Sequence, residues 1–231
     1  TRNSSSAASD VYKRQVWTSC SPDFGANGVV DRFGQVNPHI LITSNGYSYN
    51  GKLFKLEEKV NGVLESIDSI RHIVEIEYVD IKSNFNHDSI ISFGDILNGE
   101  QTKPTFEQLP FNHPLFIMYS SGTTGPPKSI VHSSGGTLIQ HMKEHQLHCD
   151  IKAGKSTMFW FTTCGWMMWN WLVSGLSSGS TIVLYDGSPS YPSLERLWKM
   201  IDDLNITHFG TSPKFLNACD SANILPNKFC K

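Results

Sequence analysis

Apolar residues occur along this chain in two patterns, short continuous runs and stretches with helical spacing. The continuous runs have the length of buried strands, and they lie at residues 39–43, 72–79, 115–119, 181–185 and 206–210. Between them, apolar residues recur every three or four positions over 53–67 and 194–204, which predicts amphipathic helices. Strands that alternate with helices predict an α/β fold of layered, mostly parallel sheets flanked by helices.

Three segments follow neither pattern. Residues 1–15 are rich in Ser and Ala, and we interpret them as an artefactual or disordered extension ahead of a domain over 16–231. Residues 45–51 form a loop after the first strand, and its glycines are too few for the fingerprint of a classical Rossmann dehydrogenase. Residues 80–114 are mostly polar, and we expect them to cover the surface.

A further helix is predicted from Ser133, whose hydroxyl can cap its first turn. Its partial apolar stripe, expected to face the core, consists of Leu138, Ile139, Met142 and Leu147. The same helix carries His141, His145 and His148, whose spacing places them on one face. No carboxylate stands where it would complete a metal-ligand set, so a packed or solvated histidine face is a better interpretation than a zinc site.

The aromatic block at 159–171 has two interpretations. In a helix, aromatic residues usually form a core stripe, which here would consist of Trp166, Trp169, Leu172 and Val173. At a strand-to-helix junction, Gly165 and Trp166 would instead shape an apolar slot for a ligand. The pattern alone leaves both interpretations open.

The strand at 115–119 ends in a loop with the composition of a polyphosphate-binding site. Hydroxyls and backbone N–H groups donate hydrogen bonds to phosphate oxygens, glycines allow close approach, and lysine supplies a positive charge. The loop offers these groups at Ser120, Ser121, Gly122, Thr123, Thr124, Gly125 and Lys128. A Walker A loop needs glycine where this chain has Pro127, so a P-loop phosphotransferase is disfavoured. A plain turn between a strand and a helix is the alternative.

The run SSGTTGPPK at 120–128 resembles the phosphate-loop signature of the adenylate-forming superfamily, which includes acyl-CoA synthetases, luciferases and the adenylation domains of peptide synthetases. The flanking stretches resemble acetoacetyl-CoA synthetases more than acetyl- or propionyl-CoA synthetases, and they lie at 16–25, 132–136, 159–171 and 184–189. The resemblance extends from residue 16 to about residue 224. It implies part of the large N-terminal domain of such an enzyme.

The resemblance implies an ATP-dependent acid–thiol ligase that forms AMP. Acetoacetate would attack the α-phosphate of ATP, and CoA would then displace AMP from the acyl-adenylate. The loop residues named above would bind ATP with Mg²⁺, and Lys128, Thr123 and Thr124 would be the catalytic groups among them. Thr162 would contact CoA. The substrate pocket would include Gly165, Trp166, Gly210, Thr211 and Ser212.

The substrates of such a reaction bring their own nucleophiles, so neither a Ser-His-Asp set nor a metal ligand is implied within these residues. The adenine, ribose and Mg²⁺ motifs of the family and its small C-terminal domain are not found in the sequence. Residues 1–231 alone are therefore expected to be inactive as a ligase. Two alternatives stay open: another short-chain acyl-CoA synthetase, such as an acetyl- or propionyl-CoA synthetase, or a non-catalytic, truncated nucleotide-binding fragment.

The net charge and the cysteine content indicate which classes of partner and which cellular compartment to expect. A net charge of −2 gives no electrostatic reason to expect nucleic acid or an anionic membrane as a partner. Five cysteines without a C-x-x-C pair fit reduced thiols. The most apolar window, 166–176, is about half of the roughly 20 residues that a membrane span needs. We therefore expect a cytosolic protein with small-molecule partners, and the oligomeric state is left open.

Overall fold

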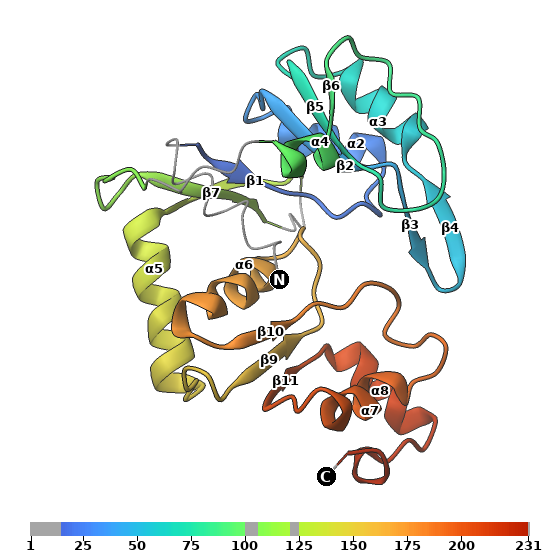
Figure 1. Cartoon of the computed structure of the whole chain (residues 1–231), viewed down its shortest axis with the longest axis vertical. Coiled ribbons are helices and arrows are strands. Elements are labelled where there is room, and N and C mark those ends of the chain that lie inside the picture. The colour runs from blue at the N-terminus through green and yellow to red at the C-terminus, as the bar shows by residue number, and fades with distance from the viewer. Residues whose placement is uncertain (1–14, 100–105, 121–124, 231) are drawn as a thin grey trace. The chain divides into compact units, whose positions relative to one another are not determined.

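A computed structural model describes residues 15–99, 106–120 and 125–230 of the chain (Figure 1). These residues form two compact units. The N-terminal unit runs as far as Leu109 and also includes Pro114–His132, whereas the C-terminal unit consists of Pro110–His113 and the chain from Ser133 onward. Residues 1–14 of the expected N-terminal extension lie outside the described residues.

The N-terminal unit contains a parallel sheet in the order β2-β5-β6. Its strands are β2 (Ile40–Ser44), β5 (His72–Ile76) and β6 (Ile90–Ser92). Helix α3 (Glu57–Leu64) lies between β2 and β5 in the chain, which confirms the strand-helix-strand order predicted over 39–79. β6 and the following helix α4 (Phe93–Asn98) were not predicted, because a strand of three residues is too short to show a periodicity.

A hairpin precedes α3 where the sequence pattern predicted the start of a helix. It pairs β3 (Gly46–Tyr49) with β4 (Lys52–Lys55), so Leu53 lies on a strand and is 51% exposed. The turn uses Asn50 and Gly51 at φ angles of 51° and 74°, the left-handed conformation that tight hairpins favour. The prediction of a helix from residue 53 is wrong, and the Asn-Gly pair was the signal against it.

The core of the N-terminal unit lies between the parallel sheet and helices α2 (Ala26–Phe33) and α3. Its buried residues include Val29, Phe33, Leu41, Val60, Val63 and Ile73. The buried side chain of Asn45 ties the end of β2 to a later loop, because its amide donates to the carbonyls of Val79 and Ile81, both at 2.8 Å. The sheet therefore ends in a fixed polar contact and not in a loose loop.

A second sheet of the N-terminal unit has the order β1-β7-β8. Its strands are β1 (Trp17–Thr18), β7 (Pro114–Tyr119) and β8 (Ser129–Ser133). β1 is parallel to β7, which matches the strand predicted at 115–119. β1 and β8 were not predicted, since β1 has only two residues and β8 is bounded by polar residues on both sides.

The C-terminal unit is built around a parallel sheet in the order β10-β9-β11. Its strands are β9 (Thr157–Trp160), β10 (Thr181–Val183) and β11 (His208–Gly210). The helices that follow them are α6 (Met167–Ser174), α7 (Arg196–Asp203) and α8 (Pro213–Ser221), with short turns of 3-10 helix η2 (Gly175–Ser178) and η3 (Pro226–Lys228). Met158 packs with Leu172 of α6, whereas its neighbour Phe159 packs with Leu197 of α7.

Adjacent residues of a strand point to opposite faces, so α6 and α7 cover the two faces of this sheet (Figure 1). The parallel pairing of β9 with both neighbours is the arrangement that the alternating pattern predicted. The predicted fold of layered, mostly parallel sheets flanked by helices is confirmed in this unit as in the other.

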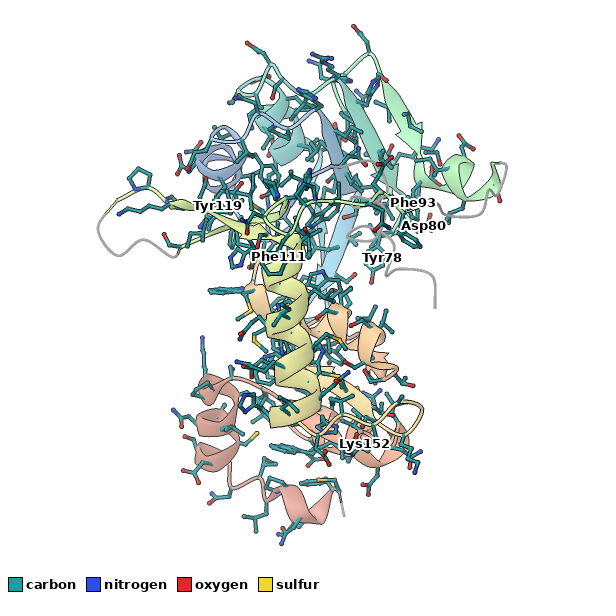
Figure 2. The ribbon with its side chains drawn as sticks, turned by 90° about the vertical axis from the view of Figure 1, so that its left-hand side faces the viewer. Tyr78, Asp80, Phe93, Phe111, Tyr119 and Lys152 are labelled. Carbon is teal, nitrogen blue, oxygen red and sulfur yellow. The ribbon has the colours of Figure 1, made fainter. Side chains whose placement is uncertain are left out.

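Helix α5 (Ser134–Lys143), which continues into the π-helical turn η1 (Glu144–His148), faces the opposite way from the prediction. Ser133 caps it as expected, accepting a hydrogen bond from the N–H of Gly136 at 3.3 Å. Phe111 packs against its first turn, as Figure 2 shows, where a Cβ on Gly135 would overlap the ring. The exposed residues of the predicted core stripe are Leu138, Ile139 and Leu147, the last of them 77% exposed. The stripe therefore does not face the core.

Two histidines are buried on this helix in place of the stripe. Nδ1 of His141 lies 2.8 Å from the hydroxyl of Ser174, and Nε2 of His145 lies 3.0 Å from the carbonyl oxygen of Trp171. The wider π-helical turn moves His148 off this face, so the packed histidine face is confirmed for two of the three residues. Among the described residues, no three His, Cys, Asp or Glu side chains gather to hold a metal ion.

The apolar window at 166–176 corresponds to α6 and the start of η2. In the described ranges, no helix is both long and apolar enough to cross a bilayer. All five cysteines lie in the described part of the chain, and each of them is a free thiol.

Candidate functional site

The candidate phosphate loop connects β7 to β8 in the N-terminal unit. Its described residues are Ser120 and 125–128. The predicted site residues that lie outside the described part are Ser121, Gly122, Thr123 and Thr124. The backbone N–H of Ser120 donates to the carbonyl of Lys128 at 3.0 Å, and the N–H of Lys128 donates to the hydroxyl of Ser120 at 3.1 Å. These two bonds join the ends of the loop, where Gly125 and Lys128 are exposed.

The loop is the tip of a hairpin. β7 and β8 are neighbours in one sheet, and residues 120–128 alone connect them. Parallel neighbours need a crossover of about a dozen residues or more, so these two strands are antiparallel. The loop therefore enters a strand, unlike a Walker A loop, which supports the case against a P-loop protein. The alternative of a plain turn is wrong only in placing a helix directly after the loop, because β8 follows it.

Tyr119 ends β7 at the base of this loop and is held by its neighbours. The hydroxyl of Thr18 on β1 donates to the Tyr119 hydroxyl oxygen at 2.9 Å, and the guanidinium of Arg32 lies 5.9 Å from the ring centroid. Burial raises the pKa of Tyr119 to about 12, although Thr18 and Arg32 both act to lower it. The phenol is thus uncharged at neutral pH and anchors the strand from which the loop leaves.

The remaining predicted site residues lie at the carboxyl end of the sheet in the C-terminal unit. Thr162 and Gly165 are in the loop after β9, and Trp166 is the cap residue of α6, with 56% of its surface exposed. The buried residues of α6 are Asn170, Trp171 and Leu172. Of the predicted core stripe, which comprised Trp166, Trp169, Leu172 and Val173, only Leu172 is among them. The core-stripe interpretation is therefore wrong, and the placement of Gly165 and Trp166 at a strand-to-helix junction is confirmed.

Gly210 ends β11, where it pairs with Trp160 of β9. A Cβ at Gly210 would overlap the indole ring of Trp160, so the close approach of the two strands requires glycine. Its carbonyl accepts a hydrogen bond from the N–H of Phe161 at 2.9 Å. The hydroxyl of Ser212 caps α8, accepting from the N–H of Phe215 at 3.2 Å, and is thereby committed to the helix.

Two buried hydroxyls at this edge lack a hydrogen-bond partner in the described part of the chain. Oγ1 of Thr163, after β9, and Oγ1 of Thr211, after β11, are buried and have no hydrogen-bond partner among the described residues. Buried hydroxyls in native proteins are nearly always paired, so two unpaired ones need an explanation. Thr211 was predicted as a site residue. Thr163 was missed in favour of Thr162, because the sequence does not show which hydroxyl of a Thr-Thr pair is buried.

The strand order places these loops where open α/β sheets usually bind ligands. From β9 the chain moves to β10 on one side and then returns to β11 on the other side of β9. Open α/β sheets bind ligands outside the carboxyl ends of their strands at such a reversal. The residues at 162–166 and 210–212 lie together at this edge of the C-terminal unit, whereas Ser120 and Lys128 belong to the N-terminal unit.

Comparison with known proteins agrees with this geometry. The model of the AMP-binding enzyme family matches residues 15–229. The chain is 47% identical over 218 residues to an acetoacetyl-CoA synthetase of Gallus gallus and 47% identical over 212 residues to that of Rhizobium meliloti (strain 1021). It is 41% identical over 233 residues to a malonamoyl-CoA synthetase of Penicillium aethiopicum. Each alignment covers 91% of this chain and 32% of the relative.

A solved structure shows the same fold. An acetoacetyl-CoA synthetase from Streptomyces lividans superposes with a TM-score of 0.90 at 42% identity, over 97% of this chain and 34% of that chain. This chain thus spans about a third of the length of the relatives that it matches. The resemblance drawn from the phosphate loop and its flanking stretches is confirmed, and the chain belongs to the family of AMP-binding enzymes.

Proposed function

We propose that the full-length protein activates acetoacetate with ATP and transfers the acyl group to CoA. The observation that carries the proposal is the similarity to acetoacetyl-CoA synthetases, which extends over 91% of this chain at up to 47% identity. The phosphate-loop hairpin and the carboxyl edge of the C-terminal sheet support it, because the reaction needs one site for polyphosphate and another for a small acid and a thiol.

The reaction has two steps whose atoms balance without a protein nucleophile. A carboxylate oxygen of acetoacetate attacks the α-phosphorus of ATP, the bond to the β-phosphate breaks, and pyrophosphate leaves with acyl-adenylate as the product. The sulfur of CoA then attacks the acyl carbonyl carbon, AMP leaves, and the thiol proton is released. The protein contributes by positioning the reactants and by stabilising charge on the phosphates.

In this proposal the loop residues bind the phosphates of ATP, which arrives with Mg²⁺ as part of the substrate. Lys128, exposed at the end of the hairpin, supplies positive charge to the phosphoryl oxygens, and Thr123 and Thr124 supply hydroxyl donors. The other loop groups that contribute are Ser120, Ser121, Gly122 and Gly125. The Ser120 hydroxyl accepts from the N–H of Lys128, so its own proton remains available to a phosphate oxygen.

The acid and CoA occupy the crevice at the end of the C-terminal sheet in the same proposal. Gly165 and Trp166 form the apolar wall, Gly210 allows close approach, and Thr162 meets CoA. The hydroxyl of Thr211 is the better candidate for a polar contact than that of Ser212, because Ser212 already caps α8. We expect this contact to be made to the 3-oxo oxygen of acetoacetate, since a buried hydroxyl without a partner gains most from an acceptor.

Malonamate is the second candidate acid, favoured by the 41% identity to a malonamoyl-CoA synthetase. It differs from acetoacetate only in an amino group where acetoacetate has a methyl group, so both acids have the same shape and the same 3-oxo oxygen. An apolar wall favours the methyl group, whereas a site with an acceptor for the amide N–H would favour malonamate.

The experiment that tests the proposal is acid-dependent exchange of labelled pyrophosphate into ATP by the full-length protein. The acids to compare are acetoacetate, malonamate, butyrate, propionate and acetate. We expect acetoacetate to give the highest kcat/KM and butyrate, which has the same chain length without the 3-oxo oxygen, to be much poorer. A preference for acetate or propionate would overturn the choice of acid, and no exchange with any acid would overturn the proposed reaction.

A further inference from the structure

The side chain of Gln35, which lies outside the loop, contacts the residue before Lys128 and the residue after it. Gln35 follows the last turn of α2, and its amide nitrogen donates to the carbonyl of Pro127 at 2.8 Å. Its amide oxygen accepts a hydrogen bond from the hydroxyl of Ser129, also at 2.8 Å. The same amide nitrogen donates to the carbonyl of Asp31 at 2.5 Å, which ties Gln35 to its own helix.

These contacts supply what the loop sequence cannot supply for itself. Pro126 and Pro127 lack a backbone N–H, so the chain before Lys128 cannot donate hydrogen bonds that would fix its course. The bonds between Ser120 and Lys128 hold one side of the loop end, and Gln35 holds the other side. The loop end is thus more firmly anchored than its composition of glycine, serine and threonine indicates.

Helix α2 also reaches the beginning of the hairpin tip. The guanidinium of Arg32 lies 5.9 Å from the ring centroid of Tyr119 and 4.7 Å from that of Phe24, and it donates to the carbonyl of Gly28 at 2.7 Å. Arg32 and Gln35 are three positions apart, on the same side of the helix end. The C-terminal turn of α2 therefore contacts the hairpin both before and after the loop.

We propose that Gln35 is a positioning residue for Lys128, because it holds the Pro127 carbonyl before that lysine and the Ser129 hydroxyl after it, so that the ammonium is held ready for the phosphates of ATP. The inference rests on the proposed function of the loop. Gln35 makes no contact with the substrate in this proposal and acts only through Pro127 and Ser129. Preorganised charges are more effective than mobile ones, because no reorganisation is needed when the phosphates bind.

The test compares Gln35→Ala and Gln35→Glu with the unaltered full-length protein by pyrophosphate–ATP exchange. We expect Gln35→Ala to lower kcat/KM for ATP on the order of tenfold, the effect of losing one or two hydrogen bonds. Gln35→Glu keeps the acceptor for Ser129 but places a carboxylate against the Pro127 carbonyl, so it should be at least as poor. The KM for the acid should stay within about twofold, and the thermal midpoint should be nearly unchanged because Gln35 is exposed.

A double-mutant cycle separates positioning from a general effect on folding. Ser129→Ala removes the same contact from the other side, so the Gln35→Ala/Ser129→Ala protein should lose less than the product of the two single effects. The matched control is Gln140→Ala on α5, an exposed glutamine whose amide donates to Glu144 of its own helix at 3.1 Å. It should leave the KM for ATP unchanged.

Three outcomes distinguish the positioning role of Gln35 from the proposed function of the loop. If Lys128→Ala abolishes exchange and Gln35→Ala leaves the KM and kcat for ATP unaltered, the positioning role is wrong and the proposed function stands. If Gln35→Ala lowers the thermal midpoint and affects both substrates equally, its role is structural and the inference is again wrong. If Lys128→Ala itself leaves exchange unaltered, the proposed function of the loop fails, and the inference fails with it.

Discussion

The phosphate-loop hairpin and the carboxyl edge of the C-terminal sheet are held in place by different forces. Lys128 is exposed, and its surroundings are fixed by hydrogen bonds between Ser120 and Lys128 and between Gln35 and the Pro127 carbonyl. The sheet edge is fixed by packing, since Gly210 lies against the ring of Trp160 and Phe159 is buried under α7. Lys128 can therefore be changed without harm to the fold, whereas at the sheet edge Gly210 and Trp160 also stabilise the unit.

The largest effect is expected on activity at the hairpin. Lys128→Ala in the full-length protein should lower pyrophosphate–ATP exchange by roughly 10²- to 10³-fold, as expected for loss of a group that stabilises transition-state charge. The free energy of unfolding should change by less than about 0.5 kcal/mol, because the side chain is exposed. Lys152→Ala is the matched control, an exposed lysine paired with Asp150 in the C-terminal unit and labelled in Figure 2. Unaltered exchange in Lys128→Ala would contradict the view that the hairpin serves activity and not stability.

The next largest effect is expected on stability at the edge. Gly210→Ala should destabilise the protein by about 1–3 kcal/mol, because the new methyl group must displace the ring of Trp160. Urea unfolding followed by tryptophan fluorescence measures this. Gly25→Ala is the control, since a Cβ there meets no atom within 4 Å. An unchanged unfolding midpoint in Gly210→Ala would show that the edge is not held by packing.

A third prediction concerns protonation of His145, which is buried in the C-terminal unit. Burial lowers the pKa of His145, although its contact with the Trp171 carbonyl and the charge of Glu144 both act to raise it. The unfolded chain therefore binds a proton more readily than the folded one, so stability is full above the unfolded pKa of about 6.5 and falls as the pH drops through the lower folded value. His145→Gln should reduce this loss between pH 7 and pH 5 in urea unfolding.

Equal pH dependence in the unaltered protein and in His145→Gln would mean that His145 is not buried in its neutral form.

The smallest effect is expected from two threonine hydroxyls, one paired within the fold and one that we propose contacts the acid. Thr207→Val removes a hydroxyl that donates to the carbonyl of Thr157 at 3.1 Å and should cost about 0.5–1.5 kcal/mol of unfolding free energy. Thr211→Val has the same shape change but removes a hydroxyl without a partner in the described chain, so it should cost nothing or stabilise slightly. Its effect should appear as a higher KM for acetoacetate. A loss of stability equal to that of Thr207→Val would contradict this assignment.

The regions that were predicted well are those in which local sequence carries the information. The strands at 39–43, 115–119 and 206–210 are apolar runs that fit no other element, and the structure has β2, β7 and β11 there. The cap at Ser133 was predicted because its hydroxyl acts on its own helix, accepting from Gly136.

The regions that were missed depend on partners distant in sequence. The apolar stripe of α5 was expected to face the core, but Ser174 and Trp171 offer hydrogen bonds to His141 and His145, and those partners are about thirty positions away. Burial of a paired histidine costs little, so the polar face turned inward. β6 likewise exists only because β5 pairs with it.

The sequence by itself determined the α/β class, the hydroxyl-rich loop ending in Lys128 and the family, because a strand run and a motif of nine residues are local features. Tertiary structure alone decided that this loop tips a hairpin, that Gln35 holds it, and that Thr163 and Thr211 keep unpaired hydroxyls. Those facts depend on which distant groups meet when the chain packs, and hydrogen bonds between residues some ninety positions apart leave no periodicity in the chain.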